Sequence, residues 1–117
     1  MVKIVECVPN FSEGRNQSVI DSIADSASGI SGARVLGVEP DPDYNRTVLT
    51  IAGEPDAVVQ AAFNVIKTSF ELIDMKMHEG ELPRIGAVDV CPFVPIQNSS
   101  MDECVELAKA LGKRVFE

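Results

Sequence analysis

The sequence has no tryptophan, a single histidine and only three cysteines, so several kinds of site have little to be built from. A structural zinc site takes four Cys or His ligands in closely spaced pairs, and His78 has no such neighbour. Cys7, Cys91 and Cys104 are odd in number, lack Cys-x-x-Cys spacing and lie in or beside apolar stretches. They are typical of buried free thiols in a reducing compartment, and we predict no bound metal.

Long apolar runs and basic clusters are also lacking. No run approaches the ~20 apolar residues of a membrane span, and the start is too polar for a signal peptide. Eighteen acidic against ten basic residues give a formal charge of −8, and the bases are scattered except at Lys113-Arg114. We therefore predict a cytoplasmic protein whose partners include neither nucleic acid nor membrane.

What the sequence does have is enough apolar material for one core. Of its 117 residues, 45% are hydrophobic and 24% charged, close to the averages of globular domains. This length predicts one domain but is short for an enzyme that must enclose two substrates. We expect the chain alone to be inactive.

Stretches rich in Val, Ile and Thr predict four strands, and polar turn residues separate them. The strands are Lys3 to Val8, Arg34 to Glu39, Arg46 to Ala52 and Ala87 to Val94. Pro9 and Pro95 close the first and the last, and residues 10–15 follow as a loop. Turn chemistry in residues 40–45 predicts a hairpin between the middle strands.

Apolar residues at helical spacing predict three helices. Asn16 is the N-cap of the first, Pro55 lies in the first turn of the second, and Ser100 with Glu103 forms a capping box for the third. The predicted buried faces are Val19, Ile20, Ile23, Ala24 and Ala27; Val58, Val59, Ala62, Phe63, Ile66, Phe70 and Ile73; and Cys104, Val105, Ala108, Leu111 and Val115.

This order predicts an α+β fold: a ferredoxin-like βαββαβ two-layer sandwich with an additional C-terminal helix. Both main helices then cover one sheet face. The first strand alternates Ile4, Glu6 and Val8 with a second apolar set, so neither side suits free solvation, and we expect another lobe or subunit to cover the other face. Because no strand follows the last helix, we also expect residues 1–117 to be a single subdomain truncated at its C-terminal end.

Three loops carry polar residues that such a fold does not need. In the first, Asn10, Ser12 and Glu13 offer hydrogen-bonding groups beside Gly14, although an asparagine-stabilised turn explains them as well. In the second, Arg46 suits a carboxylate ligand, although pairing with Glu39 or the nearby aspartates is equally simple.

Asp41, Asp43 and Asn45 in the second loop resemble a calcium loop only superficially, since the prolines and the missing glycine and distal glutamate argue against an EF-hand. The third loop, residues 74–86, is longer than a connector requires. It contains His78, whose pKa suits proton transfer, though a solvated histidine in an acidic loop is the commoner case.

Three segments together carry a family resemblance. Residues 5–14 (VECVPNFSEG), residues 45–48 (NRTV) and residues 73–95, with Gly80-Glu81, Pro83-Arg84 and DVCPFVP, resemble the motifs of glutamate formimidoyltransferases. The resemblance runs over nearly the whole chain and is to the amino-terminal subdomain of that family.

The resemblance implies a one-carbon transferase of histidine degradation, which moves the formimino group from N-formimino-L-glutamate to tetrahydrofolate as co-substrate. It also implies a related carboxy-terminal lobe that this chain lacks, a folate site between the lobes, and a homo-oligomer with buried sheet surfaces. Asn10, Arg46 and Arg84 match positions that hold substrate, and Glu39 stands where the family has aspartate.

One departure puts the activity in doubt. The family's acid/base histidine lies between the Gly-Glu and Pro-Arg pairs, where this chain has Leu82, and leucine transfers no proton. His78, one helical turn earlier, is a weak substitute. The alternative is therefore a non-catalytic binding or assembly module that keeps the fold, and an engineered or misread codon at Leu82 is a third explanation.

Overall fold

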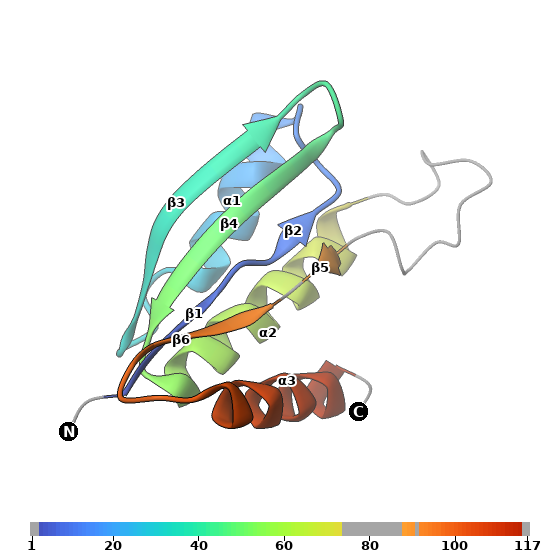
Figure 1. The fold of residues 1–117 in the computed structure, drawn as a ribbon. Coiled ribbons are helices and arrows are strands. Elements are labelled where there is room, and N and C mark those ends of the chain that lie inside the picture. The colour runs from blue at the N-terminus through green and yellow to red at the C-terminus, as the bar shows by residue number, and fades with distance from the viewer. Residues whose placement is uncertain (1–2, 74–87, 91, 116–117) are drawn as a thin grey trace.

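The computed structural model describes residues 3–73, 88–90 and 92–115 (Figure 1). Its first strand is broken at a proline: β1 (Ile4–Cys7) and β2 (Asn10–Phe11) flank Val8-Pro9, and both pair antiparallel with β4 (Arg46–Gly53). Pro9 has no N–H to donate, but its carbonyl accepts from Leu49 N at 3.0 Å. The predicted loop from residue 10 to 15 was therefore wrong in its first two residues, which form a strand.

The predicted hairpin is confirmed, with a tighter connection. β3 (Ala33–Asp41) pairs with β4 up to Asp41 opposite Arg46, so only residues 42–45 form the turn. Pro40, which we had placed in the turn, belongs to β3. Among the described residues β3 pairs with β4 alone, and such an edge strand is where a sheet tolerates proline. Asn45 closes the turn with φ of 54°.

The last predicted strand is two strands, and its predicted end at Pro95 was wrong. β5 (Val88–Val90) pairs with β2, and β6 (Phe93–Gln97) runs through Pro95 and pairs with β1. Val8 N donates to Pro92 O at 3.1 Å, between the β1–β6 pair and the β2–β5 pair. The antiparallel order across the sheet is therefore β3, β4, then β1 with β2, then β6 with β5, as in a ferredoxin-like sandwich, which confirms the predicted fold class.

Both predicted side-chain caps are present. Asn16 Oδ1 accepts from Val19 N at 3.3 Å and begins α1 (Gln17–Ala27). Ser100 Oγ accepts from Glu103 N at 3.2 Å and begins α3 (Met101–Val115). Each supplies an acceptor to an N–H that the first turn leaves unsatisfied. α2 (Pro55–Leu72) begins with proline as predicted.

Parts of the predicted buried faces were wrong. Phe70 and Val105 are 44% and 48% exposed, and Ala108 is exposed. α2 instead buries Ala61, Val65 and Ser69. The Ser69 hydroxyl donates to Val65 O at 2.7 Å, so burying this polar group costs little free energy. In α3, Leu107 rather than Val105 packs on the core. The two helices are rotated relative to the predicted stripes because they pack against each other as well as on the sheet.

All three helices lie on one side of the sheet (Figure 1). The core between the layers has Leu49 and Ile51 of β4 at its centre. Cys7 and Cys104 are buried thiols outside any disulfide, as predicted, whereas Cys91 lies outside the described residues. In the described ranges no helix is long and apolar enough to cross a membrane.

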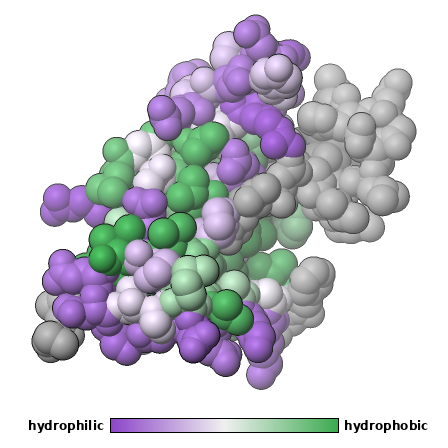
Figure 2. Space-filling view, viewed as in Figure 1, coloured by the Kyte–Doolittle hydropathy of each residue, from purple (hydrophilic) through white to green (hydrophobic). Residues whose placement is uncertain are grey.

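The other side of the sheet, which we call the open face, has no helix on it in the part of the chain that the structure describes. It bears Ile4, Glu6, Val8, Asn10, Arg34, Leu36, Glu39, Asp41, Arg46, Val48, Thr50, Ala52, Val94 and Ile96. Leu36 and Ile96 are 58% and 56% exposed, and Figure 2 shows hydrophobic side chains spread over this surface. The prediction that this face is left uncovered is confirmed for the described chain.

Candidate functional site

The register of the sheet brings three predicted site residues to one corner of the open face. Side chains alternate along β4, so Thr47 is buried beneath the helices while Arg46 and Val48 face outward. Glu39 of β3 and Asn10 of β2 both lie directly opposite Val48, one on each side. Residues directly opposite in antiparallel strands have Cβ atoms about 4.5–5.5 Å apart, so Asn10, Glu39 and Arg46 share one small surface.

Arg46 brings positive charge to this corner among carboxylates. It is exposed and lies directly opposite Asp41, with Glu39 at the diagonal position. A guanidinium stays protonated at all relevant pH values and binds a carboxylate through two parallel hydrogen bonds. Pairing of Arg46 with Glu39 or the nearby aspartates was one of the interpretations that the sequence left open, and the four-residue turn places Asp41 opposite Arg46.

Asn10 supplies an amide, which has both a donor and an acceptor. It is partly buried, and its Nδ2 lies 3.5 Å from Val8 O. That distance is the long limit of a hydrogen bond, so little is lost if the amide turns toward a ligand.

The polar groups of the loop after β2 serve the fold. Glu13 Oε2 accepts from Arg15 N at 3.1 Å and from Asn16 N at 3.0 Å, which orders the approach to α1. The simpler interpretation of this loop, a turn leading into a helix cap, therefore holds for Glu13.

The acidic turn also has a local explanation. Asp41 Oδ1 accepts from Asp43 N at 3.0 Å and lies 3.4 Å from Tyr44 N, the pattern by which aspartate stabilises a tight turn. Within the described ranges, no group of three or more His, Cys, Asp or Glu side chains is placed to hold a metal ion.

The remaining predicted residues, Leu82, His78 and Arg84, lie outside the described residues. In β5, Val88 lies opposite Phe11 and Val90 opposite Asn10. The backbone that follows the third predicted loop therefore runs beside the strand that carries Asn10.

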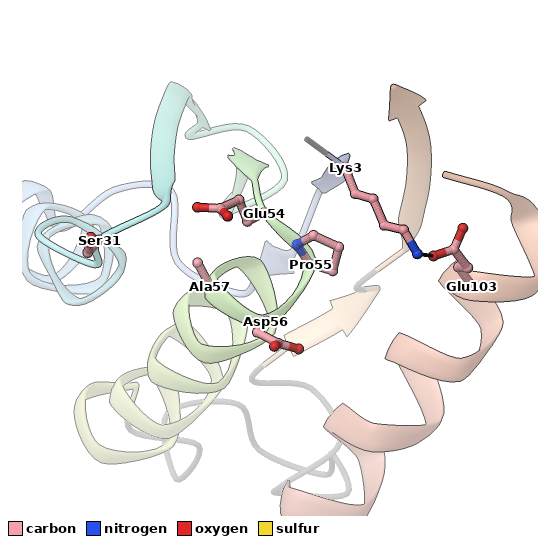
Figure 3. A pocket seen from close by; sticks show the side chains of 7 residues that line it. All are labelled: Lys3, Ser31, Glu54, Pro55, Asp56, Ala57 and Glu103. Carbon is pink, nitrogen blue, oxygen red and sulfur yellow. Dashed lines mark hydrogen bonds and ion pairs between the residues drawn. The ribbon is translucent and has the colours of Figure 1, made fainter. Parts of the chain in front are cut away.

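A depression of about 830 Å³ lies at the other end of the sheet, between the start of β1 and the first turns of α2 and α3 (Figure 3). Its charged side chains are Glu54, Asp56, Glu103 and Lys3, and Lys3 pairs with Glu103. The Lys3 ammonium, as a hydrogen-bond donor, lowers the pKa of the Glu103 carboxyl. Three carboxylates against one engaged ammonium disfavour an anionic ligand, so we place the candidate site at the Asn10–Arg46 corner instead.

The sequence matches a family model described as "Formiminotransferase domain, N-terminal subdomain" over residues 4–117. It is 53% identical over 117 residues to a formimidoyltransferase-cyclodeaminase of Dictyostelium discoideum, covering all of this chain and 22% of that protein. It is 49% identical over 115 residues to a glutamate formimidoyltransferase of Streptococcus pyogenes, covering 98% and 38%, and 49% identical over 116 residues to that of Thermoplasma acidophilum, covering 99% and 38%. The chain thus spans between about a fifth and two fifths of the length of these relatives.

Proposed function

This chain belongs to the formiminotransferase family as its N-terminal subdomain, and from that premise we propose that it forms one wall of a formimidoyltransferase ligand site. The reaction would move the formimino group from N-formimino-L-glutamate to tetrahydrofolate. The observation that carries the proposal is the meeting of Asn10, Glu39 and Arg46 at one corner of the open face, although they come from three strands.

The chemistry of this corner suits the proposed donor substrate. N-formimino-L-glutamate has two carboxylates and an amidine. The Arg46 guanidinium can donate two hydrogen bonds to a carboxylate of the substrate, and the Glu39 carboxylate can accept hydrogen bonds from the N–H groups of a protonated amidine. The Asn10 amide can hydrogen-bond to the carboxylate or to the amidine. Beside the corner, Val8, Val48 and Val94 offer apolar surface against which a flat ring of the folate co-substrate can pack and so be removed from water.

The transfer step needs a proton carrier that this chain lacks at residue 82. Attack of an amine on the amidine carbon gives a tetrahedral adduct, and a positioned acid/base group typically contributes ~10²- to 10⁴-fold to such steps. Leu82 carries no proton. This substitution favours the second candidate function, a binding or assembly module that keeps the ligand corner without turnover.

We further propose that a carboxy-terminal lobe closes the site from the open face and that the assembled protein is a cytoplasmic homo-oligomer. The lengths of the relatives support a missing lobe, since this chain covers 38% of the shorter ones.

The test restores the proton carrier. The Leu82→His variant is mixed with the carboxy-terminal lobe of a glutamate formimidoyltransferase, and formation of formiminotetrahydrofolate is followed by absorbance. The matched control is Leu82→Gln, which adds a polar side chain without an acid/base group near neutral pH. We expect turnover with histidine at least ~10²-fold above glutamine. Equal rates with ligand binding retained support the binding module, and loss of binding in every variant contradicts both functions.

A further inference from the structure

Arg46 is held from both sides by a neighbouring segment of the chain. The residue before it, Asn45, accepts a hydrogen bond from Gly14 N to its Oδ1 at 2.9 Å. The residue after it, Thr47, is fully buried and donates its hydroxyl to Glu13 O. Two consecutive residues of the loop after β2 are thus tied to the two neighbours of Arg46.

Backbone packing brings the same two segments together. Gly14 is buried, and a Cβ at this position would lie 2.4 Å from Asp41 O, 2.5 Å from Arg46 O and 2.6 Å from Arg46 N. Only glycine permits this approach. Asn45 has φ of 54°, a left-handed conformation that asparagine tolerates better than most residues. We call Glu13, Gly14, Asn45 and Thr47 the clamp.

The position of the clamp argues for more than holding the hairpin. The ladder between β2 and β4 ends at Phe11 opposite Thr47, and Arg46 is the first residue of β4. End residues of strands open at little cost in free energy. Arg46 has Asp41 of β3 opposite it but no residue of β2, and the clamp holds the chain on that second side, just past the end of the β2–β4 ladder.

We propose that the clamp positions Arg46 relative to Asn10, so that Asn45 and Thr47 are positioning residues for the ligand corner; this inference rests on the proposed function. An Arg46 backbone that is already fixed in place loses less conformational freedom when the side chain binds a carboxylate, and this raises affinity without a new contact. The clamp residues reach the ligand only through Arg46.

The experiment removes single ties and measures Arg46 directly. Asn45→Gly keeps the left-handed backbone accessible and deletes the acceptor. Thr47→Val deletes the hydroxyl and keeps the shape, whereas Thr47→Ser keeps the hydroxyl. The control Asn64→Ala deletes two hydrogen bonds of similar length far from the corner: Asn64 Nδ2 donates to Ser26 O at 3.0 Å, which joins α2 to α1, and Asn64 Oδ1 accepts from Gln60 Nε2 at 2.9 Å.

Two readouts are taken on each variant: the ¹⁵N order parameter of the Arg46 amide, and the Kd for N-formimino-L-glutamate by calorimetry. We expect Asn45→Gly and Thr47→Val to lower the order parameter from the rigid value of about 0.85 and to raise Kd about fivefold. Thr47→Ser should restore both. Asn64→Ala should lower the melting temperature and change neither readout.

The outcomes separate this inference from the proposed function. An unchanged order parameter in Asn45→Gly overturns the clamp. If Thr47→Val fails to fold, the result for Asn45→Gly alone decides. A lowered order parameter with unchanged Kd overturns the positioning role. If the wild-type chain does not bind the ligand at all while the order parameter falls, the proposed function fails and the clamp stands.

Discussion

Replacing Gly14 by alanine gives the sharpest stability prediction, because the new methyl group meets backbone atoms on three sides. A Cβ there would lie 2.4–2.6 Å from Asp41 O, Arg46 O and Arg46 N, whereas carbon and oxygen normally stay beyond about 3 Å. Gly14 is not among the positive-φ residues, so the cost arises from the contact alone. Overpacking of this kind costs about 1–3 kcal/mol, and the hairpin turn must move away from the loop.

For a chain of 117 residues, each kcal/mol lowers the melting temperature by about 3–5 °C, so we expect a loss of roughly 3–15 °C by circular dichroism. Gly112→Ala is the matched control. It lies inside α3 with nothing within 4 Å of its added Cβ, so the same substitution should stabilise the protein by about 0.5–1 kcal/mol. A loss below about 0.5 kcal/mol at Gly14 would refute the close approach on which the clamp depends.

Three further predictions concern charge, thiol chemistry and the two sheet faces. Lys3→Met should lower the melting temperature at neutral pH, and the difference from the wild-type protein should vanish at low pH. Lys3 lowers the pKa of the Glu103 carboxyl, so the ion pair stabilises the fold above the ordinary glutamate pKa of about 4.3. That stabilisation is lost as the pH falls through the lowered pKa of Glu103. Burial, and then the neighbouring Glu103 carboxylate, raise the pKa of the Cys104 thiol, so a disulfide reagent should modify it in urea but not in buffer; equal rates in both would contradict its burial. Leu49→Ala should cost about 2–5 kcal/mol in urea unfolding and Ile96→Ala less than about 1, because only the former side chain is buried; similar losses would mean that the open face is covered in the isolated chain.

Local signals in the sequence predicted the local structure well. Asn16, Pro55 and Ser100 each satisfy or avoid an unpaired N–H in the first turn of a helix, and that chemistry requires no knowledge of the tertiary fold. Prolines near strands were less informative than Pro55, because their effect depends on the neighbouring strands. Pro40 and Pro95 both lie inside strands, which the sequence alone does not reveal.

The candidate site depends on strand register, which is a tertiary property. Asn10 and Glu39 were predicted separately, but only the pairing of both with Val48 shows that they share a face with Arg46. A shift of one residue would place Glu39 on the helix side of the sheet. For Glu13, by contrast, the sequence left both a ligand role and a structural turn open, and the hydrogen bonds that its carboxylate accepts from Arg15 N and Asn16 N assign it to the fold.

The most direct test of the account is to map where N-formimino-L-glutamate binds. The ligand is titrated into ¹⁵N-labelled chain, and amide chemical shifts are followed. We expect saturable shifts at Asn10, Glu39 and Arg46, and their loss in Arg46→Gln. Shifts confined to the depression around Lys3, Glu54 and Glu103, or no shifts at millimolar ligand, would contradict a ligand corner on the open face.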